Sequence, residues 1–528
     1  MYYNSSSMRT QLYADPSGRL VHEIVLDSCR RNPAKTAIVD TGSNRRLTFA
    51  EYGELVQSAA AGLVAAGLAP HEVVAIFLPT SWEFGVMYHA ATLAGGIPTL
   101  LNPAYREREV RYQLKNSDAA FLITDGALIE GVNLGGLQAL RRVFTRNPHP
   151  GSENLAQLLR SHPARLPIQD SDTRQTIAAL PYSSGTTGLP KGVMLSHYNL
   201  VSNVYQLLGP DGTPLTHEDV MLSFLPLYHI YGLTVALTLS LSLGSTLVLM
   251  PRFDVQKLCA LLPTEGVTMM PMVPPAINAL CQAAEAGIFP KNHAVRWIKS
   301  GAAPLAPELA RRLQDLTGVI VNQGYGMTEA SPVTHVGYIA PPEKNRPTSI
   351  GQPLAQTDCR ILDLNDQEVR PGEAGELVMR GPQFMLGYWK EPQATAAALR
   401  DGWYYSGDIA RADDDGFYYI LDRRKEMIKY KGFPVAPAEV ESVLLEHPAV
   451  RDCGVVGRPD PAAGEIPCAF VVLRDGFVAG SDLNKELCSF VGDRLAHHKQ
   501  PREVRFVDAV PRTPSGKILR RELRKGLE

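Results

Sequence analysis

Short apolar runs alternate with helix-forming stretches along the chain from residue 70 to residue 325. The β-type runs lie at residues 73–78, 97–101, 121–125, 221–225, 246–249, 267–270 and 319–322. Amphipathic or apolar stretches of helical length separate them, and Thr48 with Glu51 forms a capping-box pattern before one of these stretches. This alternation predicts an α/β architecture in which helices cover mainly parallel sheets.

The pattern changes after about residue 350, where Gly, Pro and Asp become frequent and the apolar runs shorten. This texture predicts a small β-rich region. Alternation resumes near residue 436, with predicted helices at 438–446 and 482–495 and predicted strands at 452–456, 469–473 and 503–507. We therefore expect a large N-terminal domain followed by a compact α+β unit of about 100 residues.

The longest apolar segment, residues 233–250, needs to be weighed as a membrane span because a span takes about 20 residues. Several Ser and Thr residues lie within it, and Gly244 divides it. A buried helix followed by a buried strand explains this pattern better, so we expect no membrane span.

The composition is that of an ordinary globular protein. Of the 528 residues, 45% are hydrophobic and 20% are charged, and the net charge of −2 gives no basic field that would attract nucleic acid. The seven cysteines are scattered and none forms a C-x-x-C pair, which argues against a disulfide framework or a zinc site and fits a reducing compartment. The first residues lack the apolar core of a secretory signal, so we expect a cytoplasmic protein.

Residues 180–192 carry the strongest local chemical signal, LPYSSGTTGLPKG. Glycines let backbone N–H groups approach an anion, hydroxyls add donors, and Lys191 supplies a positive charge for terminal phosphates. The order is not that of a Walker A loop, in which Gly-Lys is followed at once by Ser or Thr. The alternative is a flexible surface loop. The candidate phosphate-binding residues are Ser183, Ser184, Gly185, Thr186, Thr187, Gly188 and Lys191.

This loop resembles the phosphate loop of the adenylate-forming superfamily, which contains acyl-CoA synthetases, peptide-synthetase adenylation domains and luciferases. Five further segments resemble that superfamily's motifs, in its order and over nearly the whole chain. They are FLPLYHIYG at 224–232, SGAAP at 300–304, GYGMTE at 324–329, YSGD at 405–408 and DRRKEMIKYKG at 422–432. A sixth, PSGK at 514–517, ends with the lysine that the superfamily uses in adenylation.

The resemblance implies a carboxylic acid ligase that uses ATP, Mg²⁺ and CoA and makes an acyl-adenylate and then a thioester. It makes Glu329 the Mg²⁺ ligand and Thr328 a donor to the α-phosphate. Lys517 would hold the carboxylate and the α-phosphate in line, although an isolated lysine in such a basic tail is usually only solvated. The remaining nucleotide contacts would be Gly301, Ala302, Ala303, Gly324, Tyr325, Gly326, Asp408 and Arg423.

The local sequence of these motifs is most similar to that of 4-coumarate–CoA ligases. Carried over by position, the acyl pocket would comprise His229, Tyr231, Thr234, Lys299, Gly301, Gly326, Pro332 and Val333. Lys299 could meet a phenolic oxygen, or it could simply extend to the surface. Two positions depart from the plant pattern, since Thr234 and Pro434 stand where those enzymes commonly carry Asn and Gln. Hydroxycinnamates are therefore the expected acids, with medium-chain or long-chain fatty acids as the alternative.

The superfamily rotates its C-terminal domain between the two half-reactions. In this chain the resemblance places the hinge near Asp422, so that residues 1–421 form the adenylation domain and residues 422–528 the mobile domain. Lys429, Lys431 and Gly432 would then face CoA. An amine acceptor, giving an amide, remains an alternative, as does a non-catalytic binding protein, which would be expected to lose its site lysines and carboxylates. We expect a monomer or homodimer.

Overall fold

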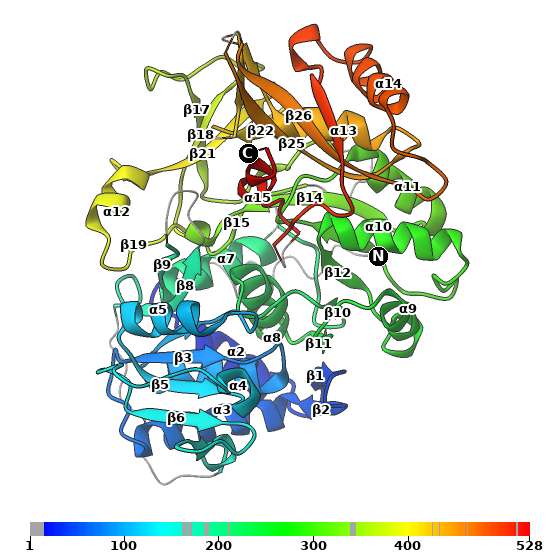
Figure 1. Ribbon diagram of the computed structural model, residues 1–528. Coiled ribbons are helices and arrows are strands. Elements are labelled where there is room, and N and C mark those ends of the chain that lie inside the picture. Colours follow the sequence, from blue (N-terminus) through cyan, green and yellow to red (C-terminus); the bar gives the residue numbers. More distant parts are fainter. Residues whose placement is uncertain are drawn as a thin grey trace.

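The computed structural model describes residues 15–160, 166, 172–183, 189–209, 212–337, 345–424, 426–431, 433–461, 463–513 and 516–527. Helices cover two large sheets in the N-terminal part, and a smaller sheet with its own helices forms the C-terminal part (Figure 1). The predicted α/β architecture is confirmed.

The first large sheet has nine strands and carries the site described below. In spatial order they are β16 (Gln352–Pro353), β15 (Val333–Val336), β14 (Ile320–Gly326), β13 (Trp297–Ser300), β12 (Met269–Met272), β10 (Val220–Ser223), β11 (Thr246–Leu249), β1 (Thr36–Asp40) and β2 (Arg45–Thr48). The strands from β14 through β1 run parallel. Their buried, nearly continuous apolar runs are typical of parallel strands covered on both faces.

The second large sheet has eight strands. Their order is β19 (Gly387–Tyr388), β9 (Lys191–Ser196), β8 (Ile177–Ser183), β4 (Ile97–Leu100), β3 (Val73–Phe77), β5 (Ala119–Thr124), β6 (Arg142–Thr145) and β7 (Glu153–Asn154). The phosphate-loop segment joins β8 to β9, which pair antiparallel.

Helices pack on both large sheets. They are α2 (Val21–Arg31), α3 (Phe49–Ala65), α4 (Trp82–Leu93), α5 (Glu107–Ser117), α6 (Gly126–Ile129), α7 (His197–Leu208), α9 (Val255–Thr264), α10 (Pro274–Glu285) and α11 (Pro307–Thr317). Most of them share one extended apolar core, and α5 and α6 contribute to a second, smaller one. The predicted capping box at α3 is confirmed: Glu51 N–H donates to Thr48 Oγ1 at 3.2 Å and Thr48 N–H donates to Glu51 Oε2 at 2.7 Å.

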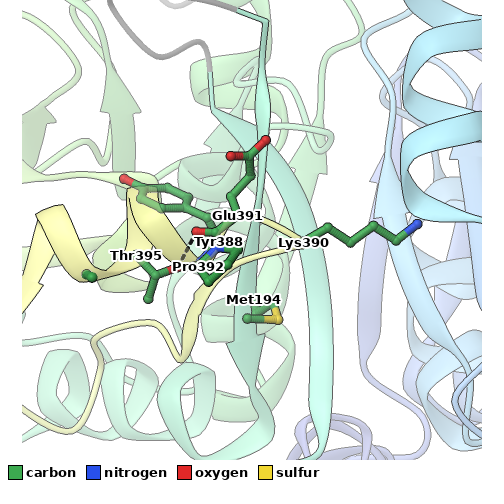
Figure 2. Close-up of a pocket in the computed structure, with 7 residues that line it drawn as sticks. Met194, Tyr388, Lys390, Glu391, Pro392 and Thr395 are labelled. Carbon is green, nitrogen blue, oxygen red and sulfur yellow. Dashed lines mark hydrogen bonds between the residues drawn. The ribbon is translucent and has the colours of Figure 1, made fainter.

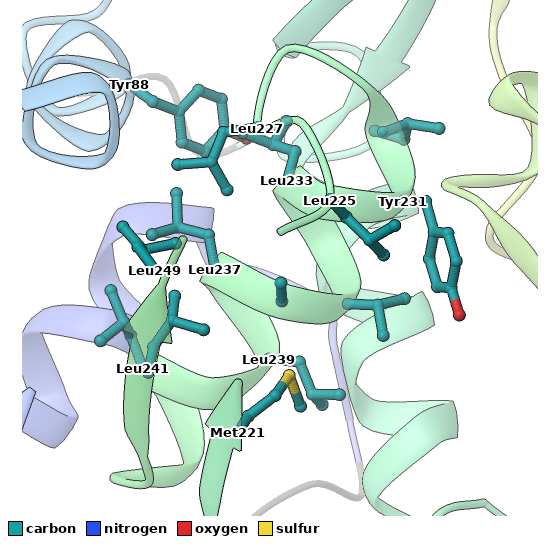
Figure 3. Close-up of a cluster of buried hydrophobic side chains, with 14 of the residues drawn as sticks. Tyr88, Met221, Leu225, Leu227, Tyr231, Leu233, Leu237, Leu239, Leu241 and Leu249 are labelled. Carbon is teal, nitrogen blue, oxygen red and sulfur yellow. The ribbon is translucent and has the colours of Figure 1, made fainter. Parts of the chain in front are cut away.

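The apolar segment 233–250 is buried inside this core. It forms the end of the π-helical segment η2 (Tyr231–Thr238), helix α8 (Leu239–Leu243) and strand β11, as the predicted helix followed by a strand. Figure 3 shows Leu233, Leu237 and Leu249 packed together there. Within the described residues, every helix is too short or too polar to cross a membrane.

The β-rich region follows the first large sheet. It contains β17 (Asp358–Leu362), β18 (Gly375–Arg380), α12 (Pro392–Ala398), β20 (Leu399–Arg400), β21 (Trp403–Ala412) and β22 (Tyr418–Arg423). The C-terminal unit contains β23 (Ile428–Tyr430), β24 (Phe433–Val435), α13 (Pro437–Leu445), β25 (Val450–Asp460), β26 (Gly464–Leu473), α14 (Ser481–Gly492), β27 (Glu503–Phe506) and α15 (Arg520–Lys525). This unit has two apolar clusters of its own, as expected for a separate α+β unit.

Candidate active site

The carboxyl ends of four adjacent parallel strands form the floor of the candidate site. Phe224 and the segment leading to His229 follow β10, and the N-terminus of α10 follows β12. Gly301 follows β13, and Thr328 with Glu329 lies just beyond β14, in the short 3₁₀ segment η3 (Thr328–Ala330). Because carboxyl ends of neighbouring parallel strands meet at one edge of the sheet, residues far apart in sequence converge here.

Glu329 is 8% exposed, and two donors hold one of its oxygens. Ser183 Oγ donates to Glu329 Oε1 at 3.2 Å, and Tyr388 Oη donates to the same oxygen at 2.9 Å. The carboxylate thus joins the end of β8 to the end of β14. A carboxylate oriented in this way, with a second oxygen available, suits a divalent cation that prefers oxygen ligands.

The predicted ribose-binding pair also comes together. Tyr325 Oη donates a hydrogen bond to Asp408 Oδ2, and Arg423 Nε lies 3.2 Å from Asp408 Oδ1. Burial raises the pKa of Asp408, and the neighbouring Arg423 and the Tyr325 hydroxyl oppose that rise. Each carboxylate oxygen keeps a lone pair, so Asp408 can still accept hydrogen bonds from a sugar.

Lys517 reaches this site from the C-terminal unit. The preceding Gly516 has a φ of +84°, and a Cβ there would lie 3.3 Å from Pro275 Cδ, so Gly516 lies directly against the start of α10. Asp408 and Arg423 both act on Lys517 electrostatically. Burial lowers the pKa of Lys517 to about 8, assisted by the nearby positive charge of Arg423 and opposed by Glu426 and Asp408.

Tyr231 and two glycines shape the predicted acyl pocket. A Cβ on Gly301 would lie 3.0 Å from Tyr231 Cε1, and a Cβ on Gly326 would lie 2.0 Å from the Pro332 carbonyl oxygen. Position 326 therefore has no room for a side chain. At position 301 the absence of a Cβ lets the Tyr231 ring lie close to the backbone. Figure 3 shows Tyr231 at the margin of the apolar cluster, with its hydroxyl directed away from the leucines. That hydroxyl donates to the Lys299 carbonyl oxygen at 3.1 Å.

Lys299 is buried at 6% exposure, so the alternative in which it extends to the surface is wrong. Its position in the middle of the parallel sheet, between β12 and β14, keeps the side chain inside. Lys299 Nζ donates to the Gly337 carbonyl oxygen at 3.3 Å, and burial lowers the pKa of Lys299 to about 7. The neutral partners available leave this amine poorly compensated.

His229 precedes Tyr231 in the sequence and Thr234 follows it. Thr234 is 1% exposed, and its hydroxyl has no hydrogen-bond partner among the described residues. His229 Nδ1 accepts from Tyr231 N–H at 3.2 Å, and burial lowers the pKa of His229 to about 4, so the ring is neutral near pH 7. The remaining pocket candidate, Val333, is 9% exposed.

Several predicted residues lie outside this cluster or outside the described residues. Ser184, Gly185, Thr186, Thr187, Gly188 and Gly432 are not described by the structure. Ala302, with a φ of +68°, and Ala303 occupy the loop after β13, and Gly324 lies within β14. Lys429 and Lys431 are exposed beside β24, in the C-terminal unit.

Sequence reasoning missed two groups near the site. One is Tyr388, which contacts Glu329 and also presents its ring to Lys191, with Nζ 5.4 Å from the ring centroid. The other is Arg520, whose guanidinium binds Glu426 and Glu441, each at 2.8 Å. Arg520 lies only three residues after Lys517, and that spacing was the one available signal. Tyr388 had none, because it lies 59 residues from Glu329 in sequence.

Comparisons with known proteins agree with this geometry. A family model for "AMP-binding enzyme" matches residues 25–389, and one for the "AMP-binding enzyme C-terminal domain" matches residues 439–517. The rice (Oryza sativa subsp. japonica) 4-coumarate–CoA ligase 5 is 36% identical over 521 residues, covering 97% of this chain and 96% of that protein.

Two solved structures show the same fold. ATP-bound MatB from Rhodopseudomonas palustris has a TM-score of 0.88 at 30% identity, covering 96% of this chain and 98% of that one. The amide bond synthetase McbA from Marinactinospora thermotolerans has a TM-score of 0.84 at 27% identity, covering 96% and 99%. With both family models matched in order over most of its length, the chain belongs to the AMP-binding enzyme family, as an AMP-forming acid–CoA ligase.

Proposed function

We propose that this enzyme activates a hydroxycinnamate-type aryl acid with Mg-ATP and transfers the acyl group to CoA. The observation that carries the choice of acid is Lys299, whose backbone carbonyl oxygen accepts from the Tyr231 hydroxyl. Its amine is buried, and the one hydrogen-bond partner of that amine among the described residues is the Gly337 carbonyl oxygen. A buried amine with so little compensation gains from a polar ligand atom. A phenolic hydroxyl supplies such an atom, whereas the methylenes of a fatty acid do not.

Thr234 supports the same choice from a second direction. Its buried hydroxyl lacks a partner among the described residues, so a ring substituent such as a hydroxyl would satisfy it. Plant enzymes of similar sequence commonly carry Asn at this position. The ring substituents that this enzyme prefers can therefore differ from those that the plant enzymes prefer. Discrimination of this kind is worth about 1–3 kcal/mol per contact.

In the first half-reaction, a carboxylate oxygen of the acid attacks the α-phosphorus of ATP, and the bond to pyrophosphate breaks. Both reactants are anionic, so positive charge must bring them together. Lys517, held against α10 through Gly516, would contact the acid carboxylate and the α-phosphate, and Lys191 would contact the departing pyrophosphate. Asp408 and Arg423 would hold the ribose, and Tyr325 the adenine.

The residues present fit Mg²⁺. Glu329 offers a buried, oriented carboxylate, and Thr328 offers a neighbouring hydroxyl. When bound, Mg²⁺ would neutralise charge on the phosphates. The chain's own part is to hold Glu329 in place and to aim the cationic side chains at the same phosphates.

In the second half-reaction, the CoA thiol loses its proton and attacks the acyl carbon, and AMP leaves. The electrostatic influence of Asp408 and Arg423 on Lys517, and the contact of Gly516 with the start of α10, support a role for Lys517 in adenylation. We propose that the unit from Asp422 onward then rotates and brings Lys429, Lys431 and Gly432 to the thiol-binding face. A hinge residue followed by charged, solvated neighbours can absorb such a change.

An amide-forming reaction is the second candidate, favoured by the similarity to McbA. The two are separated by supplying the purified acyl-AMP with CoA or with a panel of amines and measuring product formation. Thioester formation faster than every amide supports CoA as the acceptor. Amide formation with no thioester would replace it.

A further inference from the structure

Tyr388 stands between two groups that the proposed reaction uses on the same phosphates. It lies in the short edge strand β19, opposite Val193 of β9, the strand that begins with Lys191. Its hydroxyl donates to Glu329 Oε1 at 2.9 Å, and its ring faces Lys191 Nζ, which lies 5.4 Å from the ring centroid. One side chain therefore contacts both the carboxylate and the ammonium.

The hydroxyl contact decides which oxygen of Glu329 faces outward. Ser183 Oγ and Tyr388 Oη both donate to Oε1, so its two lone-pair directions are occupied. Among the described residues the structure gives no donor to Oε2. The carboxylate is thus fixed in one plane with Oε2 left for a cation, which lowers the ordering cost of metal binding.

The Tyr388 ring gives the Lys191 ammonium a neighbour that does not neutralise its positive charge. Among the described residues, no carboxylate oxygen lies within ion-pair distance of Lys191 Nζ. An ammonium over an aromatic face is attracted by the ring quadrupole yet keeps its charge. Lys191 is therefore held near Glu329 while remaining available to an anion.

Tyr388 is itself anchored on its other side. Its backbone N–H donates to Thr395 Oγ1 at 2.8 Å, a bond drawn in Figure 2, and Thr395 in turn donates to the Glu391 carbonyl oxygen. Figure 2 also shows Lys390 extended away from Tyr388. Its ammonium binds Asp118 at 2.6 Å, so it does not compete for Glu329. These bonds fix the backbone from which the Tyr388 ring projects.

We propose that Tyr388 is a positioning residue that presets Glu329 for the divalent cation and Lys191 for the pyrophosphate portion of the nucleotide. This inference rests on the proposed use of Mg-ATP. It predicts that the hydroxyl and the ring contribute separately, the hydroxyl to cation affinity and the ring to nucleotide affinity.

The test is a binding measurement on the full-length protein, with Mn²⁺ as the probe and a non-hydrolysable α,β-methylene ATP analogue as the nucleotide. Electron paramagnetic resonance reports Mn²⁺ affinity in the ternary complex, and calorimetry reports nucleotide affinity. Tyr388→Phe removes the hydroxyl alone, and Tyr388→Leu removes the ring as well. Tyr419→Phe is the matched control, because Tyr419 Oη also donates to a carboxylate, Asp413 Oδ2, at 2.9 Å, away from the Glu329 site.

We expect Tyr388→Phe to weaken Mn²⁺ binding by roughly tenfold, the usual worth of a hydrogen bond to a charged group, with nucleotide affinity nearly unchanged. Tyr388→Leu should weaken both, and Tyr419→Phe neither. Mn²⁺ affinity within twofold of the parent in Tyr388→Phe would overturn the proposal, as would equal losses in Tyr419→Phe. Absence of Mn²⁺–nucleotide binding to the parent protein would overturn it too.

The outcome is independent of which acid is activated. If the parent binds the Mn²⁺–nucleotide complex but turns over no aryl acid, the proposed substrate fails while the variants still decide the role of Tyr388. If aryl acids are activated and Tyr388→Phe binds Mn²⁺ normally, the role of Tyr388 fails alone.

Discussion

Arg423 Nε lies 3.2 Å from Asp408 Oδ1, which links the proposed hinge to the proposed ribose site. The preceding residue, Asp422, contacts the C-terminal unit instead. Its Oδ2 accepts from Ala438 N–H at 2.8 Å, in the first turn of α13. Two consecutive side chains are therefore held by different parts of the molecule. Any rotation about this point would change at least one of these contacts, so we expect nucleotide binding and the orientation of the C-terminal unit to be coupled.

Lys517 should be needed for one half-reaction only. Lys517→Ala removes the cation that would draw the carboxylate and the α-phosphate together, so adenylation should fall by at least 100-fold. Thioester formation from supplied acyl-AMP should stay within a few-fold of the parent. Single-turnover measurements of each half-reaction check this, and equal losses in both would contradict the assignment.

The same residue predicts a pH dependence. The pKa of Lys517 is lowered to about 8, so the side chain is charged below that pH and loses its charge above it. The kcat/KM for adenylation, which reports the free enzyme, should therefore fall as pH rises through about 8. Thioester formation from acyl-AMP should lack this limb. Lys517→Arg, which stays charged, should abolish the limb even if its rate is low.

Lys299 should govern both selectivity and stability. Lys299→Met should reduce kcat/KM for 4-coumarate by roughly tenfold relative to unsubstituted cinnamate, because only the former offers a phenolic oxygen. Parallel assays of the two acids check this. An unchanged ratio would show that Lys299 does not read the ring substituent.

The stability effect of Lys299 has a definite sign. Its folded pKa of about 7 lies below its usual value, so the unfolded chain binds the extra proton between about pH 7 and 10.5 and stability from this group rises with pH across that window. Below pH 7 the folded state carries the buried ammonium at full cost. The Tm gain of Lys299→Met over the parent should thus be largest near pH 6 and shrink toward pH 10. Thermal scans at both pH values measure it.

Arg520 should stabilise the unit that carries Lys517. It binds Glu426 and Glu441 and also donates to the Val455 carbonyl oxygen at 3.2 Å. Arg520→Met leaves buried carboxylates unpaired, a loss of about 3–5 kcal/mol. Differential scanning calorimetry should show an earlier C-terminal transition, partly restored by adding Glu441→Gln. No such restoration would mean that the ion pair is not the cause.

The pocket glycines should limit the size of the acid. A methyl group at Gly301 must share space with the Tyr231 ring, since Cβ would lie 3.0 Å from it. Gly301→Ala should raise the KM for ring-substituted cinnamates several-fold and spare smaller acids such as benzoate. Steady-state kinetics with both acids tests this, and a uniform change would indicate a different location for the pocket.

The alternation of short apolar runs with helix-forming stretches predicted the parallel strands, because strands buried on both faces consist almost entirely of apolar residues. Strand β12 begins at Met269, two residues later than the pattern suggested, because pairing with Met221 of β10 begins there. The side-chain contacts between residues distant in sequence could not be predicted from the sequence. Tyr388 reaches Glu329 only because β19 pairs with β9, and Arg520 finds Glu426 only after the C-terminal unit has folded. The depth of Lys299 likewise needed the strands on both sides of it.

The most direct test of the account is mass spectrometry of the products formed from ATP, Mg²⁺, CoA and a panel of acids. The panel runs from 4-coumarate, caffeate and cinnamate through benzoates to fatty acids of increasing length. The account predicts hydroxycinnamoyl-CoA as the main product, with AMP and pyrophosphate. Fatty acyl-CoA as the main product, or acyl-AMP accumulating without any thioester, would contradict it.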